Sequence, residues 1–110
     1  MTETDERQPD NGAVPYKILP KTLAGKDFVF IIVRDDFLGF PEQVRQDAID
    51  DFGADCKREG LHGNVILVWP CLDGNVGYYP EDFSEVRDFL RGIKYKEFEK
   101  LFLQTIRSAR

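Results

Sequence analysis

The strongest constraint on the fold is a run of five apolar residues, Val65–Trp69, rich in β-branched and aromatic side chains. Because apolar and polar residues do not alternate in it, a strand formed here would have to be covered on both faces. A second run of this kind, Phe28–Val33, has a charged residue on either side. Both runs are predicted to be interior strands of a sheet.

The segment between these runs has the pattern of an amphipathic helix. Pro41 and Glu42 suit the first turn, where proline loses no needed N–H and a carboxylate meets the positive end of the helix dipole. Gly53 is expected to stop or bend the helix, and Gly60 is expected to cap it. The buried stripe would comprise Val44, Ala48, Ile49, Phe52 and Cys56, and an acidic outer face would comprise Asp47, Asp50, Asp51 and Asp55.

The order strand, helix, strand predicts a βαβ unit with parallel strands. Asp73-Gly74-Asn75 is a strong turn signal, so Val76–Tyr79 is expected to return antiparallel to the second run. Because Pro70 cannot donate a ladder hydrogen bond, regular pairing should break near Trp69-Pro70 if the strand has two neighbours. Tyr16–Leu19, ended by Pro20, is expected to form a short edge strand.

Two helices are predicted near the C-terminus. The first opens at Pro80-Glu81 and ends at Gly92, and the second places Tyr95, Phe98, Leu101, Phe102, Thr105 and Ile106 on one inward face. The predicted fold is a small single α/β (or α+β) domain over residues 15–110. It has a three- to four-stranded mixed sheet with a βαβ unit, a β-hairpin and two C-terminal helices.

Residues 1–14 are polar and acidic, and they are expected to form a disordered lead because such a composition cannot bury apolar area. The chain of 110 residues carries a net charge of −5. No apolar run approaches the ~20 residues of a membrane-spanning helix, so membrane insertion is not expected. With two separate cysteines, Cys56 and Cys71, the expected location is the reducing cytoplasm.

The carboxyl ends of the two predicted interior strands are where a ligand would bind in a parallel sheet. Asp35 and Asp36 lie at one of these ends and could hold a hard cation such as Mg²⁺, although a solvated strand end is the favoured interpretation. Cys71 lies at the other, where a buried structural thiol is favoured over a reactive one. No phosphate loop, zinc spacing or catalytic triad occurs, so no cofactor is predicted and an enzymatic function is not favoured.

Four aromatic residues outside the predicted core are candidates for recognition. Phe37 and Phe40 lie in an apolar loop, Trp69 at a strand end, and Tyr78 in an edge strand. Because side chains alternate along a strand, Tyr78 and Tyr79 should point to opposite faces. We expect Tyr79 to point inward and Tyr78 outward.

The leading functional prediction is a non-enzymatic interaction or regulatory module that uses its edge strand and aromatic loop, with a protein partner or as a homodimer. One alternative is a metal-dependent or phosphate-binding domain that uses Asp35 and Asp36. Another is nucleic-acid contact through a basic helix at the C-terminus, where basic residues outnumber acidic ones. The net acidity of the chain weakens this last alternative.

Overall fold

The computed structural model of the chain describes residues 15–34 and 39–107. Within them, five strands form one mixed sheet, and three helices accompany it. The predicted α/β class is therefore confirmed, with more strands than expected. The acidic lead and the loop residues Asp35, Asp36 and Phe37 lie outside the described residues.

The strands are β1 (Pro15–Leu23), β2 (Lys26–Ile32), β3 (Asn64–Pro70), β4 (Val76–Tyr79) and β5 (Gln104–Arg107). Their order across the sheet is β4-β3-β2-β1-β5. Only β2 and β3 are parallel, and the other neighbours pair antiparallel. The chain passes from β2 to β3 through α1 (Glu42–Arg58). The remaining helices, α2 (Ser84–Leu90) and α3 (Tyr95–Glu99), separate β4 from β5.

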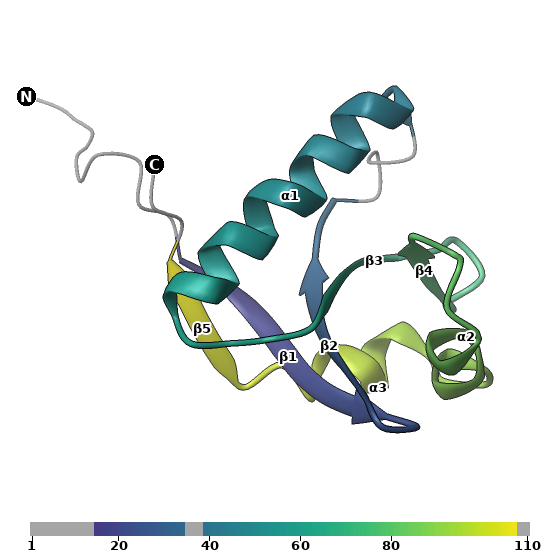
Figure 1. Cartoon of the computed structure of the whole chain (residues 1–110). Coiled ribbons are helices and arrows are strands. Elements are labelled where there is room, and N and C mark those ends of the chain that lie inside the picture. The colour runs from purple at the N-terminus through teal and green to yellow at the C-terminus, as the bar shows by residue number, and fades with distance from the viewer. Residues whose placement is uncertain (1–14, 35–38, 108–110) are drawn as a thin grey trace, which may run out of the picture.

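Each face of the sheet has its own hydrophobic core. Figure 1 shows α1 running across one side, with α2 and α3 grouped on the other. The α1 core includes Ile18, Val29, Leu67 and Trp69, and the opposite core includes Phe28, Phe30, Ile66, Val68, Phe98 and Phe102. Alternate residues of β2 and β3 thus enter opposite cores, which explains why neither strand has a polar face.

Pairing at the end of β3 accommodates Pro70. The β2 ladder ends where Ile32 is opposite Val68, whereas the β4 ladder continues to Pro70 opposite Val76. The backbone N–H and C=O of Val68 are directed toward β2, because the carbonyl of Val68 accepts a hydrogen bond from the N–H of Val33 at 2.8 Å. By alternation the nitrogen of Pro70 is directed the same way, beyond the end of that ladder, so no ladder bond is lost.

The N-terminal hairpin is longer than the sequence predicts. The expected strand ends at Pro20, but β1 continues to Leu23 and turns through Ala24 and Gly25, which both have positive φ. Pro20 is opposite Val29. On its other side β1 is paired with β5 only as far as Ile18, so the missing N–H of Pro20 costs nothing there.

The prediction of one C-terminal helix that carries both Tyr95 and Ile106 is wrong. The helix α3 ends at Glu99, and Gln104–Arg107 form β5 against β1. Phe98 and Phe102 enter the core beside α2, whereas Ile106 enters the α1 core on the other face of the sheet. A single helix could not supply both faces, and the free edge of β1 provides backbone partners for a strand.

Three features of α1 also differ from prediction. The helix runs past Gly53 to Arg58 without ending. Asp55, expected on the acidic outer face, is only 3% exposed. Its carboxylate accepts from the Tyr16 hydroxyl at 2.8 Å and forms an ion pair with Arg58. Val44, expected in the buried stripe, is exposed.

The contact between Tyr16 and Asp55 predicts a loss of stability in alkali. Burial, followed by the hydrogen bond to Asp55 and its charge, raises the pKa of Tyr16 well above its ordinary value. Because the unfolded pKa is lower, the stabilisation is complete below pH ~10 and is lost as pH rises from there toward the folded pKa. Urea unfolding should show Tyr16→Phe to be less stable by about 1–3 kcal/mol at neutral pH. The difference in unfolding free energy between the wild type and Tyr16→Phe should become smaller above pH ~10. A difference that does not change with pH would contradict the hydrogen bond from Tyr16 to Asp55.

Alanine substitutions at Gly77 and Gly53 should change the unfolding free energy in opposite directions. A Cβ at Gly77 would overlap Nε1 and Cε2 of Trp69, whose indole occupies that space. Gly77→Ala should therefore cost about 1–3 kcal/mol of unfolding free energy, as overpacking does. A Cβ at Gly53 would meet only Val65 Cγ2, at 3.9 Å. Gly53→Ala should stabilise the helix by up to about 1 kcal/mol, and thermal or urea unfolding measures both.

Candidate functional site

The β3–β4 hairpin is the best-defined surface feature near the end of the parallel pair. Its turn, Cys71–Asn75, is closed by hydrogen bonds from Cys71 N to Asn75 O and from Gly74 N to Cys71 O, both 3.0 Å. The Asp73 carboxylate accepts from the backbone N and from Nδ2 of Asn75, also at 3.0 Å. Gly74 has φ +86°, a conformation that favours glycine.

The turn is also tied to the segment between α2 and α3. Tyr95 N donates to Gly74 O at 2.8 Å, and Lys94 Nζ donates to Asn75 Oδ1 at 3.0 Å. Asn75 and Lys94 further form an isolated antiparallel bridge. The tip of the hairpin is therefore ordered by hydrogen bonds within the turn and by hydrogen bonds to Lys94 and Tyr95, so it is preorganised.

Leu72 is at the tip of this turn, and it is 109% exposed. The hydrogen bonds hold the backbone of this turn, but the side chain of Leu72 buries no apolar area. It therefore contributes nothing to the stability of the fold. Large exposed apolar residues elsewhere include Leu103, which is 90% exposed. Two hollows lie beside the turn that carries Leu72.

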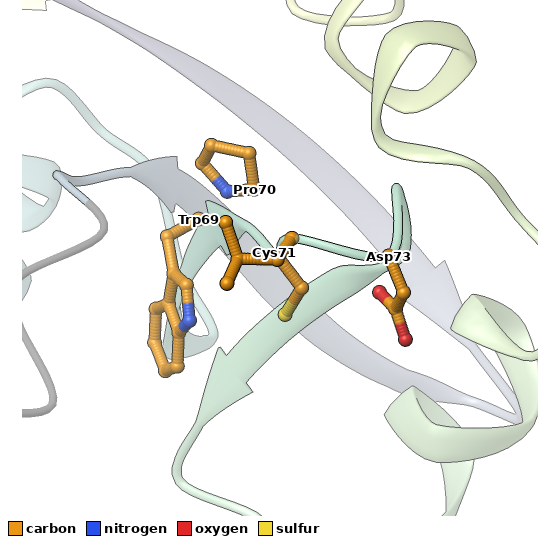
Figure 2. A pocket seen from close by; sticks show the side chains of 5 residues that line it. Trp69, Pro70, Cys71 and Asp73 are labelled. Atoms are coloured by element: carbon orange, nitrogen blue, oxygen red, sulfur yellow. The ribbon is translucent and has the colours of Figure 1, made fainter.

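The first hollow lies on the α1 side of the hairpin and has a volume of about 600 Å³. It is lined by Trp69–Asp73. Figure 2 shows the side chains of Trp69, Cys71 and Asp73 directed to one side of the strand and Pro70 directed to the other. The hollow is open to solvent, and its one carboxylate already serves the turn.

The second hollow, of about 370 Å³, lies between the hairpin and the start of α3. Its lining is predominantly apolar and comprises Pro70, Cys71, Gly74, Lys94, Tyr95 and Lys96. Burial, and secondly the charge of Glu99, raises the pKa of the half-buried Tyr95. The phenol is therefore neutral at physiological pH, and Lys94 and Lys96 are the charged residues among those that line this hollow.

The chemistry of Cys71 argues against nucleophilic catalysis here. Burial and then the charge of Asp73 raise the pKa of the Cys71 thiol. Thiolate is the nucleophilic form, so a raised pKa makes the group less reactive at neutral pH. Among the described residues no three His, Cys, Asp or Glu side chains are grouped so that they could hold a metal ion.

Of the four residues predicted for interaction, the three that the structure describes lie in different surroundings. Trp69 is 4% exposed and belongs to the α1 core, so its ring is not available on the folded surface. Phe40 is exposed beside the start of α1, and Phe37 lies outside the described residues.

The two tyrosines of β4 do face opposite sides, but both pack. Tyr79 lies against the α1 core with the Arg45 guanidinium 4.9 Å from its ring centroid, and Tyr78 lies against the opposite core. The prediction that Tyr78 points outward is therefore wrong, because α2 and α3 cover its face of the sheet.

Sequence reasoning missed the residues that flank the hollows. Leu72 stands alone as an apolar residue within a run of turn formers, which is the one signal that could have identified it. Lys94 lies just before α3 and Lys96 lies within it, and nothing in the sequence pattern shows that this segment packs on the hairpin. The basic residues near the C-terminus are distributed over several elements, so the single basic helix that would contact nucleic acid is not present in the described chain.

Comparisons of the chain with protein-family models, with curated proteins and with solved structures give no match. None of the helices within residues 15–34 and 39–107 combines the length and apolar character needed to cross a membrane.

The state of Cys71 predicts slow alkylation. In a Cys56→Ser variant, iodoacetamide should modify Cys71 more slowly at neutral pH than it modifies a free cysteine peptide. The rate should rise as pH passes the ordinary thiol value of ~8.5 and continue to rise beyond it. Mass spectrometry measures the rate, and a reaction faster than that of the peptide at neutral pH would contradict the raised pKa.

Proposed function

We propose that the protein is a non-enzymatic recognition module that binds a protein partner through the tip of the β3–β4 hairpin. The observation that carries this proposal is the position of Leu72, fully exposed on a turn whose backbone is held by hydrogen bonds from Cys71, Gly74 and Tyr95. Binding costs less when the contacting residues are already ordered, so a rigid turn presenting an apolar side chain suits recognition.

The side chains of the edge strand β4 contribute less to the proposed recognition surface than the sequence suggests. Asn75, the residue just before β4, is bridged to Lys94, and both tyrosines of β4 pack on the cores. The two tyrosine side chains expected to recognise a partner along this edge are therefore engaged within the fold. The hairpin tip replaces the edge strand and the aromatic loop as the proposed contact, and a cytoplasmic location is retained as part of the proposal.

The raised pKa of Cys71 also favours binding over catalysis at this site. A protonated thiol in a partly apolar hollow behaves as a small apolar contact. The hollows flanking Leu72 are open grooves rather than enclosed cavities, which suits a protein surface or a peptide more than a small substrate.

This proposal predicts that Leu72 dominates binding. A displayed library of random linear peptides is selected against the immobilised full chain, and the affinities of the selected peptides are then measured by titration calorimetry. Leu72→Ala should weaken them by about 10-fold to 100-fold, corresponding to the burial of one leucine. The variant should fold normally, because the side chain makes no packing contact to lose.

Leu103→Ala is the matched control, since Leu103 is also exposed but lies away from the hairpin, just before β5. It should leave the affinities unchanged. A selection that returns no peptide dependent on Leu72 would overturn the proposal.

A further inference from the structure

The hollow beside α3 differs in charge from the α1-side hollow. Its lining includes two lysines, Lys94 and Lys96, whereas the α1-side hollow carries the Asp73 carboxylate. Lys94 is fixed by its hydrogen bond to Asn75, and Lys96 is exposed in the first turn of α3. Positive charge therefore lies at a predominantly apolar surface within a chain whose net charge is −5.

No carboxylate is among the residues that line this hollow. Glu97 approaches the ammonium of Lys100 at 3.8 Å, and Asp73 is held in hydrogen bonds to Asn75. Glu99 is close enough for its charge to raise the pKa of Tyr95, but none of Glu97, Glu99 and Asp73 lines the hollow beside α3. Tyr95 adds no negative charge because its pKa is raised.

We propose that the hollow formed by Pro70, Gly74 and Tyr95 takes an apolar side chain of an acidic peptide segment, whose carboxylates pair with Lys94 and Lys96. This inference rests on the proposed function and specifies the partner. The hollow supplies the apolar contact beside Leu72, and the lysines supply charge complementarity, which sets specificity and association rate more than affinity. Its volume of about 370 Å³ is sufficient for one or two side chains rather than a folded domain.

The charges of Lys94 and Lys96 also predict which peptides should bind poorly. A basic segment would bring like charges to Lys94 and Lys96 at a partly apolar surface, where repulsion is screened less than in open solvent. A neutral apolar peptide would leave the two ammonium groups at the rim of the contact without carboxylate partners. Discrimination among equally apolar peptides should therefore follow their charge.

The test uses the peptides selected on the full chain and measures their composition and their response to Lys96→Glu. Peptides that need Leu72 should be rich in Asp and Glu around one large apolar residue. Lys96→Glu should weaken them about threefold to tenfold, because exposed ion pairs contribute modestly. Their affinity should also fall as salt is raised.

Lys57→Glu is the matched control, because it changes the net charge equally on an exposed residue near the end of α1. It should leave binding unchanged. Peptides that need Leu72 but are neutral or basic, or that are insensitive to Lys96→Glu, would overturn this inference and leave the proposed function standing. Sedimentation of the chain without peptide provides a further test. A dimer abolished by Leu72→Ala would assign the hollow to a second copy and overturn the acidic partner.

Discussion

The structure depends on a pair of neighbouring strands that have no polar face. Side chains of β2 and β3 enter both hydrophobic cores, so a layer on only one side of the sheet would leave half of them in water. The helix α1 supplies one cover, and α2 with α3 supplies the other (Figure 1). The outer strands β1, β4 and β5 follow from this arrangement, because they complete the backbone pairing of a centre that is already buried.

Local patterns predicted the parts of the fold that depend on local chemistry. The two apolar runs became β2 and β3, and the turn residues Asp73 to Asn75 placed β4 antiparallel to β3. The start of α1 beside Pro41 followed from the same kind of signal. In each case the residue types restrict the backbone or the burial whatever the rest of the chain does.

The features that were missed depend on contacts between distant segments. Ile106 and Phe102 fit one helical stripe, but the sheet separates them because β1 offers an unpaired edge to β5. Asp55 looks like a surface residue until Tyr16, far away in the sequence, donates to it. The hollow beside α3 could not be foreseen for the same reason, since it exists only where the segment around Lys94 meets the hairpin. Pairing partners of this kind cannot be read from periodicity.

The packing of Trp69 against Gly77 has a practical consequence. The chain contains a single tryptophan, and its indole lies at the base of the hairpin that carries Leu72. Tryptophan fluorescence therefore originates from one known position in the molecule, next to the hairpin tip. Any event that loosens or tightens the hairpin alters the surroundings of that fluorophore, so the molecule carries its own optical reporter and needs no attached label.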